Sequence, residues 1–127
     1  MNDSKSKFKG MSKVVRAAFY RTESGNEPVR TWLWSLTNED RNVIGYAISK
    51  VEFMWPLGMP LCRSLGDGLH EVRVNLKSNR IGRIFFFIDQ ELHMVIVHGM
   101  VKKTQKTSMT DLELARSNKR RYESREL

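Results

Sequence analysis

The sequence predicts a small α+β domain in which a helical hairpin packs on a mainly antiparallel sheet, with the element order β-α-α-β-β-β-α. Two amphipathic segments with helical spacing follow one another in the first half, three apolar segments joined by short turns follow in the second half, and a polar helical segment ends the chain. At 127 residues, the chain has the length of one domain. We expect residues 1–10 to be a disordered leader, with Met11 as an alternative start, and residues 11–127 to form the domain.

The first half is expected to hold one strand and the two helices. Residues 14–20 are rich in β-branched and aromatic residues and form the strand. A helix begins at Pro28, with Asn26 or Glu27 as its cap, because proline fits the first turn of a helix. The segment TNED at 37–40 supplies the cap of a second helix, which ends at Pro56. The apolar positions that recur at helical spacing include Val29, Trp32, Leu33 and Leu36, then Ile44, Ala47, Ile48 and Val51.

The second half is expected to hold three strands and a last helix. Residues 56–68 contain several Gly and Pro residues and are predicted to be a loop. The strands cover residues 69–76, 80–88 and 92–101, with short turns between them. The last two are almost continuously apolar, which is typical of central strands covered on both faces. The last helix begins near Thr107 or Ser108, with Met109, Leu112 and Ala115 on one side.

The charge of the chain indicates a polyanionic partner. The 22 Lys and Arg residues exceed the 14 Asp and Glu residues, which gives a net charge of +8. Residues 101–127 hold eight basic and four acidic residues, a surplus of +4, so half of the excess lies at this end. Nucleic acid or an acidic protein segment fits such a surface. Cys62 is the only cysteine, and no apolar run has the length of a membrane helix, so we expect a cytoplasmic protein without a membrane partner.

The alternation of side chains in the predicted strands places two arginines among apolar residues. In residues 69–76, Glu71 and Arg73 share one face, while the opposite face suits a core beneath the helical hairpin. Arg83 shares a face of the next strand with phenylalanines. A buried arginine without a partner is costly. Two interpretations therefore stay open: Glu71 neutralises Arg73 or Arg83 structurally, or the two arginines flank a groove that binds an anion.

Three lysines follow the last predicted strand directly, at positions 102, 103 and 106. Lys102, Lys103 and Lys106 form a candidate phosphate-binding corner beside a helix start, although a solvated turn has a similar composition. His98 precedes them and is either an acid or base or a structural histidine. No pair of His, Asp or Glu has the spacing of metal ligands on one element, so we expect no metal and no other cofactor.

Three segments of the second half resemble a known pattern. They are LGDGLHEVR at 65–73, RIFFF at 83–87 and VHGMVKKTQKT at 97–107. This pattern resembles the phage-derived, HigB-like branch of the RelE/ParE toxin superfamily. Val72, Met100 and Ser108 are conservative departures from the branch, whereas Phe86 stands where many members carry tyrosine.

The resemblance implies a toxin of a type II toxin–antitoxin module that cleaves mRNA on the ribosome, with the 2′-hydroxyl of the RNA as nucleophile and no metal. It implies a helix-turn-helix, HigA-like antitoxin as partner, beside the ribosome and mRNA. The expected catalytic residues are Arg73, Arg83, Lys102, Lys103, Lys106 and His98. The two arginines are expected to grip the phosphate, Lys102 or Lys103 to act as the base and Lys106 to hold the phosphate, with His98 as the alternative acid or base. Further candidates for RNA binding are Lys77, Arg80, Arg116 and Arg120. The alternative is a binding protein, either a ParE-like inhibitor of DNA gyrase or a ribosome-binding module.

Overall fold

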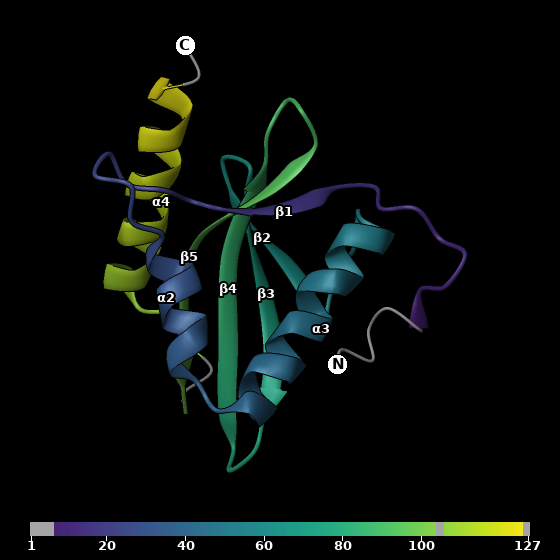
Figure 1. Ribbon diagram of the computed structural model, residues 1–127. Helices are drawn as coiled ribbons and strands as arrows, with labels where there is room; N and C mark the ends of the chain where they lie inside the picture. Colours follow the sequence, from purple (N-terminus) through teal and green to yellow (C-terminus); the bar gives the residue numbers. More distant parts are fainter. Residues whose placement is uncertain (1–6, 104–105, 126–127) are drawn as a thin grey trace.

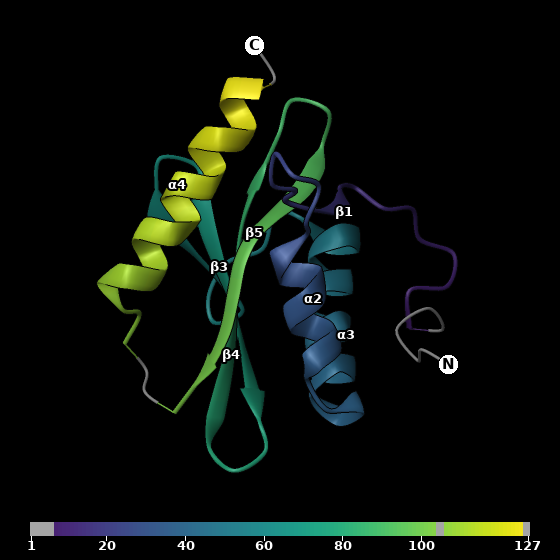
Figure 2. The ribbon, with the colours of Figure 1, turned by 60° about the vertical axis from the view of Figure 1, so that its left-hand side comes forward.

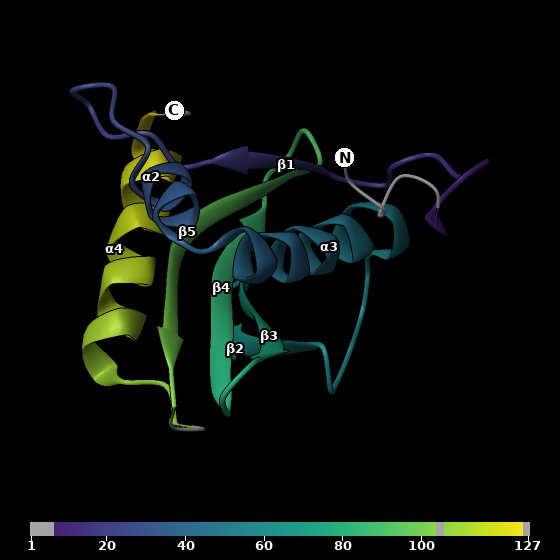
Figure 3. The ribbon, with the colours of Figure 1, turned by 60° about the horizontal axis from the view of Figure 1, so that its bottom comes forward.

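A five-stranded sheet forms the centre of the computed structural model, which describes residues 7–103 and 106–125 (Figure 1). The strand order across the sheet is β1-β5-β4-β3-β2. β1 pairs in parallel with β5, and all other neighbouring strands pair antiparallel. Figure 3 shows β1 beside β5 at one edge of the sheet. The strands are β1 (Arg16–Phe19), β2 (Cys62–Gly66), β3 (Leu69–Leu76), β4 (Arg80–Ile88) and β5 (His93–Lys102).

The helices cover both faces of this sheet (Figure 2). α2 (Pro28–Ser35) and α3 (Asn38–Met54) form the predicted hairpin on one face, over a core that includes Val72, Ile84 and Phe86. α4 (Met109–Arg125) lies on the other face, where Ala115 packs against Phe85. The predicted α+β class and the packing of the hairpin on a mainly antiparallel sheet are confirmed. No helix in the part of the chain that the structure describes is long and apolar enough to cross a membrane.

Local chemistry explains the helical hairpin. Pro28 stands at the first turn of α2, and the Thr37 hydroxyl accepts a hydrogen bond from the Asp40 amide at the start of α3. Arg41 donates to the carbonyl of Leu36, just past the end of α2, over 2.9 Å. The guanidinium thereby satisfies a carbonyl that the helix leaves without an internal partner.

The prediction of a loop over residues 56–68 is wrong in its second half, because β2 occupies Cys62–Gly66. β2 and β3 form a hairpin joined by Asp67 and Gly68, both with positive φ angles of 54° and 79°. An Asp-Gly pair is a strong signal for this type of two-residue turn. The sheet therefore has five strands, one more than predicted.

The remaining predicted strands are confirmed, and β4 is buried along almost its whole length. The register between β4 and β5 shifts near the middle. Phe85 pairs with His98 and Phe86 pairs with Ile96, so Val97 is an extra residue in β5. The Val97 carbonyl accepts a hydrogen bond from the Asn118 side chain of α4 over 3.0 Å. Val97 thus forms a β-bulge, which changes the direction of every following side chain in β5.

The end of the expected leader packs on α3. Phe8 is 7% exposed, and its ring stacks on Phe53 with 4.6 Å between the centroids. Tyr46 lies beside the same ring. Burial of a phenylalanine ring favours such packing, and the disordered leader over residues 1–10 stays a prediction. Residues 1–6 of this prediction lie outside the described residues.

Candidate active site

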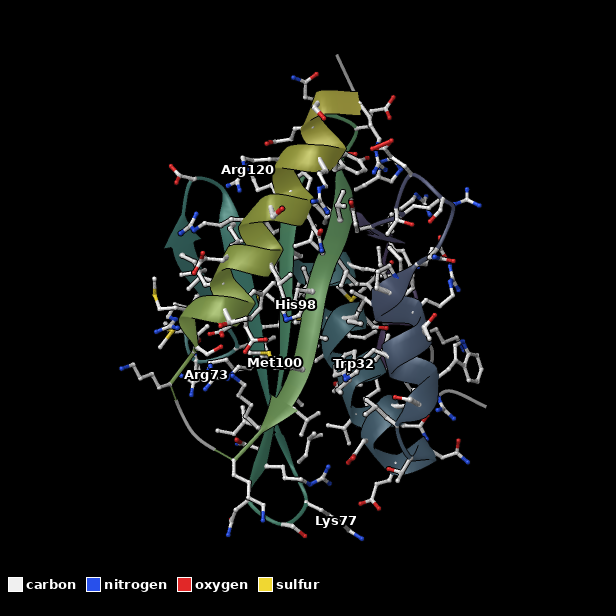
Figure 4. All side chains as sticks on the ribbon, turned by 90° about the vertical axis from the view of Figure 1, so that its left-hand side faces the viewer. Trp32, Arg73, Lys77, His98, Met100 and Arg120 are labelled. Carbon is white, nitrogen blue, oxygen red and sulfur yellow. The ribbon has the colours of Figure 1, made fainter. Side chains whose placement is uncertain are left out.

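The bulge at Val97 directs a set of polar side chains of β5 toward α4. Val95 and Val97 already face the core beneath α4, so plain alternation would turn His98 to the opposite face. Instead, His98 pairs with Phe85 and contacts its ring edge-on, on the face that α4 covers. The same shift places Gly99 against Trp32 of α2 and brings Lys102 to the side of α4. Figure 4 shows His98 and Trp32 on opposite sides of β5.

Asp111, in the first turn of α4, joins His98 and Lys102. Its Oδ1 lies 2.8 Å from His98 Nε2, and its Oδ2 lies 2.5 Å from Lys102 Nζ. The Ser108 hydroxyl donates to Oδ2 and accepts from the Asp111 amide, which caps the helix. Burial raises the pKa of Asp111, but the hydrogen bonds from Lys102, Ser108 and His98 outweigh it and hold that pKa well below its usual range. Asp111 is therefore a carboxylate at neutral pH.

A second charged cluster lies beside the first, on β2, β3 and β4. Arg83 and Glu71 are fully buried and form an ion pair of 2.9 Å. Arg63 reaches the other Glu71 oxygen over 3.2 Å. The Thr107 hydroxyl donates to Glu71 and accepts from Arg83. Because Thr107 and Ser108 are neighbours, this cluster and the Asp111 cluster fix the chain just before α4 from two sides.

The structure favours the ion-pair interpretation for Arg83. Its side chain has no exposed surface and neutralises Glu71. Arg83 supports the site from inside the sheet instead of lying at its surface. Arg73 pairs with Arg83 in the β3–β4 register and is half-buried. Figure 4 shows Arg73 near the start of α4, close to Met100.

The other two predicted lysines lie at the surface of the same region. Lys103 follows the last residue of β5, and Lys106 lies just before Thr107; both are exposed. Thr104 and Gln105 of the resembling motif lie outside the described residues. The structure therefore brings His98 and Lys102 together at Asp111 and places Arg83 in the neighbouring cluster, where it contacts Thr107. Lys103 and Lys106 are exposed and lie next to these clusters along the chain.

The four further candidates for RNA binding lie elsewhere. Arg80 forms two hydrogen bonds with Asp40 of α3, at 2.7 and 3.1 Å, and these bonds lower the pKa of Asp40. Lys77 lies 3.2 Å from Glu39 at the far end of the β3–β4 hairpin (Figure 4). On α4, Arg116 donates to the Leu65 carbonyl over 2.7 Å. Arg116 and the exposed Arg120 line a shallow hollow on the outer side of that helix.

One group of metal-ligating residue types occurs among the residues that the structure describes. Ligand atoms of Asp89, Glu91 and His93, in the β4–β5 turn, lie within 4.8 Å of one another. Asp89 already accepts hydrogen bonds from the Glu91 and His93 amides, the His93 ring and the Tyr122 hydroxyl. These bonds give Asp89 a role in closing the turn and tying it to α4. The group lies at the other end of β5 from Lys102.

A comparison with protein-family models identifies the chain. Residues 31–120 match the model described as "Phage derived protein Gp49-like (DUF891)". The chain belongs to the Gp49-like family. This family is a RelE/Gp49-type toxin family of toxin–antitoxin systems. The match includes both charged clusters and the first turn of α4. A search of curated proteins finds no match.

The sequence does not single out four residues of the site: Asp111, Ser108, Thr107 and Arg63. The spacing of Ser108 and Asp111 is that of a capping motif and marks the start of a helix. It does not indicate that the same carboxylate reaches two residues of β5. Arg63 lies in the strand that was predicted to be a loop, so its alignment with Glu71 could not be predicted.

Proposed function

We propose that this Gp49-like protein is an mRNA endoribonuclease that acts on the ribosome and is the HigB-like toxin of a two-component module. The observation that carries the proposal is the meeting of His98 and Lys102 at Asp111, close in the chain to the exposed Lys103 and Lys106. The proposal also has support from the membership in a toxin family and from the +4 surplus of residues 101–127.

The proposed reaction uses the RNA's own 2′-hydroxyl. The 2′-oxygen forms a bond to phosphorus, and the bond from phosphorus to the 5′-oxygen breaks. A base takes the 2′ proton, and an acid gives a proton to the departing 5′-oxygen. The products are a 2′,3′-cyclic phosphate and a 5′-hydroxyl. The reaction needs a base, an acid and fixed cations around the crowded phosphate, all of which protein side chains can supply.

The geometry favours a division of roles. His98 supplies an imidazole, a group that can both accept and donate a proton. Lys102 donates to a carboxylate and thus acts as a cation. Arg73 can grip a phosphate with two hydrogen bonds. Lys103 and Lys106 are exposed and attract RNA phosphates or neutralise the departing oxygen. Arg83 holds Glu71, Thr107 and the sheet in place.

The proposed partners follow from the same surface. mRNA and ribosomal RNA supply the phosphates that the basic residues attract. A helix-turn-helix, HigA-like antitoxin with an acidic segment is the proposed silencing partner, since a basic surface is neutralised most simply by complementary charge. Arg116 and Arg120, on the outer side of α4, are candidates for contacts with either partner.

Induction of the protein in cells, followed by mapping of RNA 5′ ends, tests this function. We expect growth arrest with new 5′-hydroxyl ends inside translated mRNAs, and no such ends after induction of His98→Gln. Lys50→Ala, a change of one lysine on α3, is the control and should cleave like wild type. Arrest without new RNA ends, together with loss of DNA supercoiling, would support the gyrase inhibitor instead.

A further inference from the structure

Asp111 bonds three groups that come from two parts of the chain. His98 and Lys102 reach it from β5, and Ser108 reaches it from the start of α4. The Asp111 side chain is 15% exposed and that of His98 is 20% exposed, so water has limited access to this pair. A helix cap needs only the Ser108 bond to the Asp111 amide, so the two contacts from β5 go beyond the needs of α4 itself.

The ionisation of Asp111 decides which nitrogen of His98 carries the proton. The low pKa of Asp111 makes its carboxylate an acceptor only. His98 Nε2, at 2.8 Å, must therefore be the donor. In a neutral imidazole the other nitrogen, Nδ1, then has a free lone pair. Among the residues that the structure describes, none forms a hydrogen bond with Nδ1.

We propose that Asp111 is the positioning residue of the active site: it fixes His98 as the Nε2–H tautomer, with Nδ1 as the base, and fixes Lys102 beside it as a cation. This inference rests on the proposed RNA cleavage. In that reaction, Nδ1 takes the proton of the 2′-hydroxyl while the 2′-oxygen attacks phosphorus. A carboxylate that orients a histidine base in this way also stabilises the imidazolium that forms.

The competing interpretation is that Asp111 only fastens α4 to β5. Both interpretations predict that its loss weakens the fold, so melting temperature alone does not separate them. They differ in the tautomer of His98 and in the rate of the chemical step. A structural fastener would leave the cleavage rate unchanged in any variant that stays folded.

The experiment combines ¹⁵N NMR of histidine-labelled full-length protein with single-turnover cleavage on programmed ribosomes. The variants are Asp111→Asn and Asp111→Glu, and Glu123→Gln is a control with the same loss of charge on the same helix. The His98 signals are assigned by their absence in His98→Gln. We expect the Nε2–H tautomer in wild type and in Glu123→Gln. Asp111→Asn should shift His98 toward Nδ1–H, because the amide can donate to Nε2, and should cleave at least about tenfold more slowly.

The affinity of Asp111→Asn for the ribosome should remain within about twofold of wild type. Asp111→Glu should restore part of the Nε2–H population of His98 and part of the cleavage rate. An Nδ1–H tautomer in wild type would overturn the inference. So would a folded Asp111→Asn variant that cleaves at the wild-type rate. If wild type cleaves no RNA, the proposed function fails and the catalytic role of Asp111 fails with it, whereas the tautomer still shows whether Asp111 orients His98.

Discussion

Arg83 and Glu71 form an ion pair of 2.9 Å in which neither side chain has any exposed surface. Each charge is far more costly to bury alone than with its partner, so the pair acts as one unit of the fold. The pair contacts the segment that leads into α4, because Thr107 forms hydrogen bonds with both Arg83 and Glu71. The stability of the sheet and the placement of the active site therefore depend on the same contact.

Arg83→Ala should destabilise the protein strongly. The change leaves Glu71 buried without its main partner, at a cost of about 3–5 kcal/mol in the free energy of unfolding. The double variant Arg83→Met/Glu71→Leu should recover much of the loss, since it removes both charges. Urea unfolding followed by circular dichroism measures both effects. A single variant as stable as wild type would show that the pair does not support the fold.

Arg73→Ala should behave in the opposite way. Arg73 lies opposite Arg83 in the strand pairing, but it is half-buried, so its loss should cost no more than about 1 kcal/mol of stability. Cleavage should fall at least about tenfold, because the site loses a cation at the phosphate. Melting and single-turnover cleavage of the same preparation give both numbers. A stable variant with full activity would remove Arg73 from the site.

Gly99→Ala should be destabilising because of Trp32. A Cβ atom at position 99 would lie 2.5 Å from Cζ3 of the Trp32 ring, which is closer than two non-bonded carbon atoms approach each other. We expect a loss of about 1–3 kcal/mol, as for other overpacked sites. If the clash with Trp32 causes this loss of stability, Gly99→Ala should cost less in a Trp32→Leu background. Equal penalties in the two backgrounds, measured by thermal unfolding, would assign the glycine requirement to something other than Trp32.

The Asp111 contacts should make the stability depend on acid. The pKa of Asp111 is lower in the folded protein than the value of about 3.9 for an unfolded chain. The stability that its ionisation contributes is therefore complete above that pH and is lost as the pH falls through the folded pKa. The difference in unfolding free energy between wild type and Asp111→Asn should shrink from pH 5 to pH 2. A constant difference over that range would show that the Asp111 charge adds nothing to stability.

Most of the fold could be predicted from the sequence because its signals are local. Helical spacing, Pro28 and Thr37 define the helical hairpin, and continuous apolar segments define β4 and β5. β2 has no such pattern: its residues alternate without a marked apolar face, and the preceding Gly and Pro residues favour a loop. The Asp67-Gly68 turn was the available signal for this strand.

The site could be predicted only in part, because its geometry depends on distant contacts. Simple alternation places Val97 beneath α4 and His98 on the opposite face. The bulge at Val97 instead turns His98 to the face that α4 covers. Nothing in the local sequence marks the bulge. In the same way, the partner of Arg83 could be suggested from Glu71, whereas the link between Asp111 and His98 requires α4 to pack on β5.

The central claim is that the site at the start of α4 cleaves mRNA, and the lysine pair at the end of β5 tests it most directly. Lys102 lies against Asp111, whereas Lys103 is exposed, so their substitutions should differ. The measurement is single-turnover cleavage on programmed ribosomes at saturating protein, beside binding at two salt concentrations. Lys102→Ala should lower cleavage at least about tenfold, Lys103→Ala should mainly weaken binding and its salt dependence, and Lys106→Ala should affect both. If all three variants cleave at the wild-type rate and lose only a small and equal part of their binding, the claim is contradicted. The lysines would then only attract RNA without sequence or site preference.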